Sequence, residues 1–225
     1  FIRNCISYRP YNLRFAKTIR SEKYQILYNP KSGPSKTFHQ ITNRVNADIK
    51  ICLDNEYNNP IYNYYLPNDN SKHIVEKYSE LLFYYDLNTQ VVNWLPDYFY
   101  QFPSSIDQKK YISVNISAGN QKRRLPVNKW IKIFTHILKN YDVNIALFAS
   151  SKESGDAKKI KQIFEDRVFY PLESPNLYYA SGIINESDML LSLDTSLIHL
   201  AAALNKPIIG LYNNDKVAHA RYHPY

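Results

Sequence analysis

The sequence predicts an α/β fold whose second half is a doubly wound parallel sheet and whose first half is a less regular α/β domain. In the second half, short apolar runs alternate with segments whose apolar residues recur at helical spacing, which is the pattern of consecutive βαβ units. Between the halves, residues 95–107 carry Pro96 and Pro103 among aromatic and polar residues, which is typical of a connector. The predicted domains are therefore residues 1–107, which include the connector, and 108–225.

The first half contains three recognisable elements. Residues 24–28 and 49–53 are short apolar runs of strand length. Between Ile74 and Tyr85, apolar residues recur on one face of a helix. These elements indicate a second, incomplete α/β domain.

The second half contains a regular alternation of strands and helices. The predicted strands span residues 111–116, 144–148, 168–170, 189–193 and 208–211. The predicted helices carry an apolar stripe from Trp130 to Tyr141, a second stripe made of Ala157, Ile160, Ile163 and Phe164, and the segments 177–184 and 195–204. We expect the aromatic stripe that begins at Trp130 to pack onto the sheet.

The composition narrows the class of protein. Lys and Arg number 28 against 20 Asp and Glu, a net charge of +8 that favours anionic partners. The basic residues are scattered, so a mildly basic surface is the simpler reading and no nucleic-acid partner is expected. Cys5 and Cys52 stand apart without a metal-binding pattern, which fits a reducing cytoplasm. No apolar run approaches the roughly 20 residues of a membrane span, so any membrane contact is peripheral.

The segment from Asp188 to Asp215 carries the strongest chemical signal. An apolar strand delivers Asp194 and Thr195 at its carboxyl end, where open α/β sheets bind ligands, and a helix begins at once. The N–H groups and hydroxyls of its first turn can hold a phosphate, and His199 lies on the same helix face as Thr195. In the alternative reading, Asp194 or Thr195 only caps the helix and His199 is a buried core residue. No GxGxxG or P-loop fingerprint is present among the five glycines.

The motif D-T-S-L-x-H-L-A-A-A-L-x-K-P-x-I-x-L-Y, which begins at Asp194, resembles the signature of glycosyltransferase family 9. The resemblance implies two Rossmann-like domains of the GT-B type, with the nucleotide-sugar-binding domain at the carboxyl end. It also implies that Asp194, Thr195, Ser196 and His199 contact the sugar and pyrophosphate of the donor.

Two further segments resemble the same family. In NISAGNQKRRLPVNKW, which precedes the helix at Trp130, the resemblance places Ser117 and Gly119 in the donor loop. It places a phosphate-contacting cation at Arg123, with Lys122 and Arg124 as neighbours that can substitute. In LFASSKESGDAKKI it places Glu153 on the ribose of the donor, although an exposed glutamate at a helix start is nearly as good a reading.

The chain also departs from the family pattern. Asn213, Asn214 and Asp215 stand where the family has a Gly-Pro-Thr type turn, and Ser196 stands where many members have glycine. The resemblance implies a piece that is incomplete at both ends, lacking the helices after the last strand and the aspartate that acts as general base, which is expected N-terminal to Phe1. We therefore expect this chain to bind donor but to transfer sugar slowly or not at all.

The resulting expectation is a cytoplasmic glycosyltransferase, located at the inner face of the membrane if it associates peripherally. It would transfer a sugar, heptose from ADP-heptose, to a lipopolysaccharide core or a related anionic glycolipid or glycan. Transfer would proceed with inversion. No cofactor is expected, because the nucleotide sugar is a substrate, and no metal is expected, because the sequence has no magnesium-binding DxD pattern. Two alternatives stay open: a basic nucleotide- or nucleic-acid-binding module without transfer chemistry, and a family relative that uses another nucleotide sugar.

Overall fold

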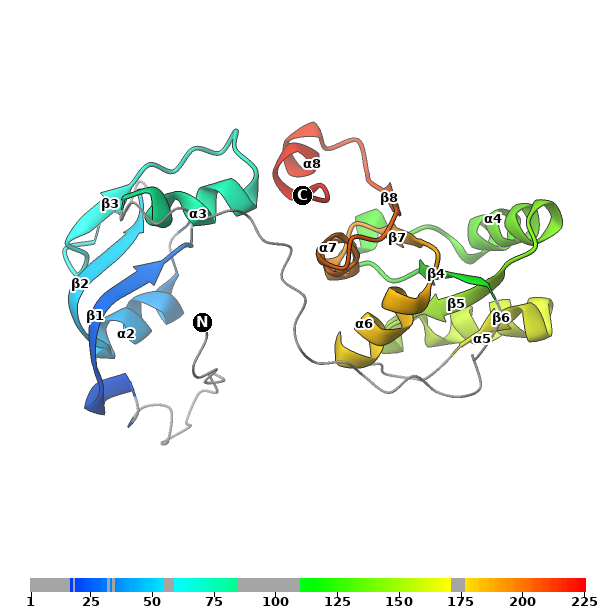
Figure 1. The fold of residues 1–225 in the computed structure, drawn as a ribbon, viewed down its shortest axis with the longest axis horizontal. Coiled ribbons are helices and arrows are strands. Elements are labelled where there is room, and N and C mark those ends of the chain that lie inside the picture. Colours follow the sequence, from blue (N-terminus) through cyan, green and yellow to red (C-terminus); the bar gives the residue numbers. More distant parts are fainter. Residues whose placement is uncertain are drawn as a thin grey trace. The chain divides into compact units, whose positions relative to one another are not determined.

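The structure is a computed structural model in which the chain divides into two compact units, residues 1–89 and 90–225 (Figure 1). The predicted connector at 95–107, and the predicted domain boundary near residue 108, lie outside the described residues. The residues that the structure describes are 17, 19–31, 33, 35–54, 59–84, 110–170 and 177–225.

The N-terminal unit is built on a three-stranded parallel sheet in the order β1-β2-β3. Ser35 begins the first helix after β1, because its hydroxyl accepts the N–H of Phe38 at 3.4 Å. A small core of Ile51, Leu53 and Leu66 packs against Leu81, which lies on the last helix of this unit. The elements are β1 (Lys23–Asn29), α2 (Lys36–Arg44), β2 (Asn46–Leu53), β3 (Tyr64–Leu66) and α3 (Ile74–Tyr84).

The C-terminal unit is a doubly wound domain around a five-stranded sheet, and all its strands are parallel. Its strands are β4 (Tyr111–Asn115), β5 (Asn144–Phe148), β6 (Val168–Phe169), β7 (Leu190–Leu193) and β8 (Ile208–Leu211). Its helices are α4 (Val127–Asn140), α5 (Ser154–Phe164), α6 (Leu177–Glu186), α7 (Ser196–Ala203) and α8 (Lys216–Tyr222). The predicted strands and helices of this half are thus all present, with ends that differ by a few residues.

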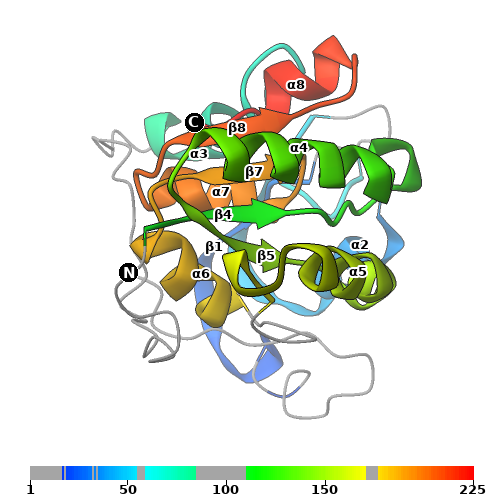
Figure 2. The same cartoon turned by 90° about the vertical axis from the view of Figure 1, so that its right-hand side faces the viewer.

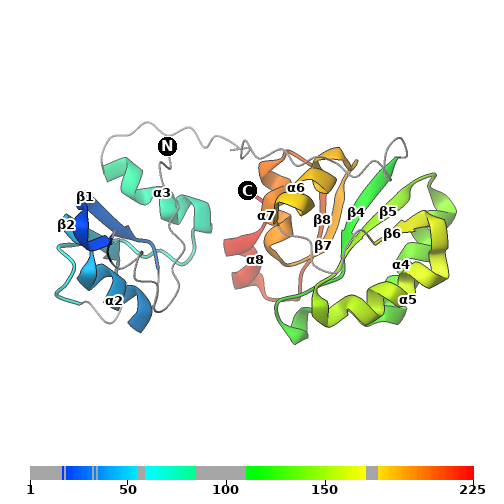
Figure 3. The same cartoon turned by 90° about the horizontal axis from the view of Figure 1, so that it is seen from below.

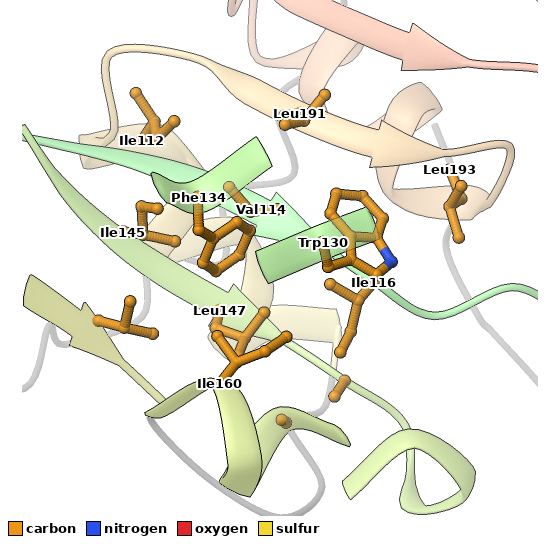
Figure 4. Packing of buried hydrophobic residues seen from close by; sticks show 13 residues of the cluster. Ile112, Val114, Ile116, Trp130, Phe134, Ile145, Leu147, Ile160, Leu191 and Leu193 are labelled. Atoms are coloured by element: carbon orange, nitrogen blue, oxygen red, sulfur yellow. The ribbon is translucent and has the colours of Figure 1, made fainter. Parts of the chain in front are cut away.

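Helices cover both faces of this sheet (Figure 3). Alternate strand residues point to opposite faces, so Val114 packs with α4 and α5, whereas Tyr111 packs with α6 and α7. Figure 2 looks onto the face that α4 and α5 cover. On that face, the predicted aromatic stripe of α4 buries Trp130 and Phe134 against the strands (Figure 4).

The strand order positions the site. The order β6-β5-β4-β7-β8 places β4 between β5, which follows it in the chain, and β7, which comes much later. The chain therefore runs from β4 to β5 in one direction across the sheet and from β7 to β8 in the other. Open α/β sheets bind ligands at such a topological switch point, between the two strands where the order reverses. Both strands present their carboxyl ends at the same edge, with Asn115 paired in register to Ser192.

Several sequence predictions need correction. Helix α2 and strand β3 were not predicted, and helix α8 follows the last strand, where no helix was expected. Ile163, which was placed on the apolar side of α5, is 48% exposed. Phe164, the last residue of the helix, does face the core, and its ring centroid lies 5.9 Å from that of Phe134.

Tyr111 supplies a test of how this unit responds to alkali. Its hydroxyl donates to the carbonyl oxygen of Ile183 at 2.8 Å, and burial, followed by the charges of Glu186 and Asp188, raises the pKa of Tyr111. A raised pKa favours the folded state below about pH 10, the usual value for tyrosine, and this stabilisation is lost as pH rises above it. We expect Tyr111→Phe to cost about 1 kcal/mol of unfolding free energy at pH 8.

The same variant should lose less stability than the wild type between pH 8 and pH 10.5, because phenylalanine has no hydroxyl proton that the unfolded chain releases more readily than the folded one. Urea unfolding followed by circular dichroism at both pH values measures this difference. Tyr141→Phe is the control, because Tyr141 is 61% exposed. An equal pH dependence for Tyr111→Phe and the control would contradict the prediction.

Candidate functional site

A cleft of about 360 Å³ opens at the carboxyl ends of β4, β5 and β7. Its polar wall is made mainly of hydroxyl groups, and its apolar wall comes from β5, α6 and α7. The lining residues are Asn115, Ser117, Phe148, Ala149, Ser150, Ser151, Leu177, Ala180, Thr195, Ser196 and Leu197. The sequence prediction that Ser117, Thr195 and Ser196 share a site therefore agrees with their placement around one cleft.

The start of α7 lies in this cleft without a side-chain cap. Thr195 occupies the N-cap position in extended conformation, yet its hydroxyl accepts no N–H of the helix. The first N–H groups of a helix have no acceptor within it, so their partial positive charge faces the cleft. The reading in which Thr195 merely caps the helix does not describe this geometry.

The Thr195 hydroxyl is instead held by Asn115, the last residue of β4. The side-chain nitrogen Nδ2 of Asn115 lies 3.0 Å from Thr195 Oγ1 and 3.0 Å from Ser192 Oγ. Asn115 was not among the predicted site residues. The signal in the sequence was an asparagine within the predicted strand 111–116, close to its carboxyl end.

Arg123 links the loop after β4 to the end of β7. Its guanidinium forms an ion pair with the carboxylate of Asp194 at 2.8 Å, and about a third of the Arg123 side chain is exposed. These two predicted donor-binding residues therefore lie together. Lys122 is exposed and Gly119 has open space around it, and neither lines the cleft.

Glu153 lies behind the cleft instead of in it. It is only 4% exposed, and its carboxylate is bound by the guanidinium of Arg124 and by the hydroxyl of Ser150. Glu153 and Arg124 line a separate pocket of about 230 Å³ beside Trp130. Ser150 therefore connects the two, because it lines the main cleft and also donates to Glu153.

His199 lies one helical turn after Thr195 and is exposed, so it is not a buried core histidine. It does not line the cleft. Just after β8, burial and then the charge of Asp194 raise the pKa of Tyr212 to about 12, so this hydroxyl stays neutral at physiological pH. Asp194 directly precedes Thr195, which lines the cleft, and Arg123 is paired with Asp194, but neither charged residue lines the cleft itself.

Two features of the described residues bear on the predicted metal and membrane contacts. Across the part of the chain that the structure describes, no three His, Cys, Asp or Glu side chains gather as a metal site requires. The predicted absence of a metal nevertheless stays a prediction. None of the described helices has the length and apolar character needed to cross a membrane.

Comparison with known proteins relates this fold to one family. Residues 12–225 match the family model described as Glycosyltransferase family 9 (heptosyltransferase). A putative glycosyltransferase of Haemophilus influenzae is 24% identical over 198 residues, which are 88% of this chain and 53% of that protein. The chain therefore spans about half the length of this relative.

Solved structures share the fold at low sequence identity. The structure of E. coli heptosyltransferase WaaC with ADP superposes with a TM-score of 0.72 at 19% identity, covering 93% of this chain and 67% of that one. The structure of WaaC with ADP-2-deoxy-2-fluoro heptose gives a TM-score of 0.62 at 18% identity, covering 88% and 64%. The predicted α/β fold with two Rossmann-like domains is confirmed.

Proposed function

Because this chain belongs to glycosyltransferase family 9, we propose that its C-terminal unit binds the diphosphate of a nucleotide sugar in the cleft before α7. The donor proposed is ADP-heptose. The complete enzyme would transfer the sugar to a lipopolysaccharide core or a related anionic glycan, at the inner face of the cytoplasmic membrane. Transfer would proceed with inversion and without a metal.

The uncapped start of α7 is the observation that carries this proposal. Unsatisfied N–H groups and the helix dipole attract an anion, and the dipole contributes roughly 0.3–1 kcal/mol. Because this contribution is modest, hydrogen bonds from the surrounding hydroxyls must supply most of the affinity. Ser117 and Ser196 flank Thr195 in the cleft and provide such donors.

The ion pair of Arg123 and Asp194, next to Thr195 in the chain, suits the departing diphosphate. Arg123 is partly exposed beside Asp194, so its guanidinium can turn to a phosphate while Asp194 takes a sugar hydroxyl. Together with His199, Arg123 would stabilise the negative charge that develops on the leaving group. A carboxylate in the complete enzyme would deprotonate the acceptor, and a single displacement at the anomeric carbon inverts its configuration.

Ser150 is a better candidate than Glu153 for contacting the nucleoside of the donor, because Ser150 lines the cleft. Ser150 and Ser151 line the cleft, whereas Glu153 lies behind them. Glu153 would orient the Ser150 hydroxyl toward a ribose instead of contacting the ribose itself. The WaaC structures with ADP and with an ADP-heptose analogue support an ADP-sugar as donor.

The N-terminal unit has a feature that supports an anionic acceptor. A cleft of about 350 Å³ lies where β1 and β2 end, and Lys31, Lys36 and His39 line it. Lys31 and Lys36 are exposed cations that can pair with carboxylate or phosphate groups of a glycan. The proposed acceptor is therefore bound by the N-terminal unit.

Calorimetric titration of this chain with ADP tests the donor site. We expect Thr195→Val and His199→Ala each to weaken ADP binding about five- to tenfold, because each removes one hydrogen bond to a charged group. Thr135→Val is the matched control, since the Thr135 hydroxyl bonds to the carbonyl of Ile131 on the exposed face of α4. If both site variants bind ADP as tightly as the control, the proposed pocket is wrong.

A further inference from the structure

Asn115 connects the two loops that form the cleft. It is 3% exposed and ends β4, the central strand of the sheet. Its Nδ2 reaches Ser192 on β7 and Thr195 at the start of α7, and its Oδ1 accepts the N–H of Ser117 at 3.1 Å. One buried amide therefore fixes groups that are about 80 residues apart in the sequence.

The hydrogen atoms of this cluster can be assigned from its geometry. The Ser192 hydroxyl donates to the carbonyl oxygen of Leu193 at 2.7 Å, so toward Asn115 it acts as an acceptor. The amide of Asn115 carries two hydrogens, and the hydroxyls of Ser192 and Thr195, at 3.0 Å each, lie nearer to it than the carbonyl oxygen of Ser117 at 3.3 Å. Thr195 Oγ1 thus receives a hydrogen from Asn115, while its own hydrogen can be donated to Ser192 Oγ at 3.4 Å, a long contact that a phosphate oxygen can replace.

This contact explains why α7 is uncapped. A threonine at an N-cap position ordinarily turns its oxygen to the N–H two or three residues later, which here belongs to Leu197 or Ile198. In this structure the oxygen is turned to Asn115, and no side-chain cap forms. Because no side chain caps the helix, the N–H of Leu197 is left for a ligand in the cleft, which Leu197 lines.

We propose that Asn115 is a positioning residue that prevents Thr195 from capping its own helix and so keeps the start of α7 open to a diphosphate. This inference rests on the proposed function, because it presumes that the diphosphate binds there. It assigns Asn115 two effects. Leu197 keeps its N–H for the ligand, and the Thr195 hydroxyl is oriented to donate to a phosphate oxygen.

The rate of amide hydrogen exchange at Leu197 in the ligand-free chain tests the mechanism, because the proposal and a purely structural role predict changes in opposite directions. In Asn115→Ala, Thr195 is released and caps the helix, so exchange at Leu197 becomes slower than in the wild type. A purely structural role for Asn115 predicts the opposite, because a loosened strand end would make exchange faster. Faster or unchanged exchange at Leu197 therefore overturns the proposal.

ADP titration provides the second measurement. We expect Asn115→Ala to bind ADP about five- to tenfold more weakly than the wild type, an effect like that of losing one hydrogen bond to a charged group. The effect should vanish in the Thr195→Val background, because Asn115 acts through Thr195. Additive losses in the double variant would show that Asn115 acts by another route.

Two further variants keep the test decisive. Asn115→Leu is close in size and uncharged and loses the donor to Thr195, so it serves if Asn115→Ala fails to fold. Ser192→Ala removes the other buried partner of Asn115 and should leave ADP affinity within about twofold, because the contact to Thr195 remains.

The outcomes separate this inference from the proposed function. If Thr195→Val leaves ADP binding unchanged, the donor site itself is misplaced. If Thr195→Val weakens binding but Asn115→Ala and Asn115→Leu do not, only the role of Asn115 is wrong.

Discussion

Replacing Phe134 with alanine is expected to lower the unfolding free energy of the C-terminal unit by about 3–5 kcal/mol. Phe134 is fully buried on α4 beside Trp130 (Figure 4), and its ring centroid lies 6.2 Å from that of Trp130 and 5.9 Å from that of Phe164. The truncation removes these contacts and leaves a cavity that neighbouring strands can fill only in part. Urea unfolding followed by tryptophan fluorescence measures the loss.

Ile163→Ala is the control for this prediction. Ile163 lies on the neighbouring helix α5 and is 48% exposed, so its truncation should cost less than about 1 kcal/mol. Similar losses for the two variants would mean that the core between α4, α5 and the sheet does not carry the stability of this unit.

The sequence predicted those elements whose side chains separate clearly into buried and exposed faces. All strands of the C-terminal sheet are apolar runs, and α4 carries its aromatic stripe toward the core. Helix α2 was missed because its buried residue is Thr42, not an apolar side chain. Strand β3 was missed because three residues are too few to show the alternation of buried and exposed side chains that marks a strand, and its position depends on pairing with β2.

The site was predictable to the extent that it follows from strand ends. Thr195 and Ser196 follow the carboxyl end of a predicted strand, where open α/β sheets bind ligands, whereas Ser117 was assigned to the site only through the family resemblance; all three line one cleft. Asn115 could not be assigned, because its role arises only when β4 and β7 become neighbours. Glu153 does not line that cleft, because its carboxylate is bound by Arg124, and pattern reasoning does not reveal such an ion pair.

The same reasoning extends to the charge at the start of α7. Ser196 is the first residue of that helix, is exposed and lines the cleft. A carboxylate there interacts favourably with the helix dipole and should raise stability by roughly 0.3–1 kcal/mol. The same carboxylate would occupy the proposed diphosphate position and repel the ligand, so Ser196→Asp should stabilise the protein and yet weaken ADP binding.

The expected loss of ADP affinity for Ser196→Asp is at least about tenfold, because like charges about 5 Å apart near a protein surface repel by a few kcal/mol before screening. Thermal unfolding and ADP titration of one preparation measure the two effects, and added salt should restore part of the affinity. Thr37→Asp is the matched control, since it places the same charge in the first turn of α2 in the other unit. It should stabilise its helix by a similar amount and leave ADP affinity unchanged. If Ser196→Asp binds ADP as tightly as Thr37→Asp does, the diphosphate is not held at the start of α7, whatever the stability of the helix.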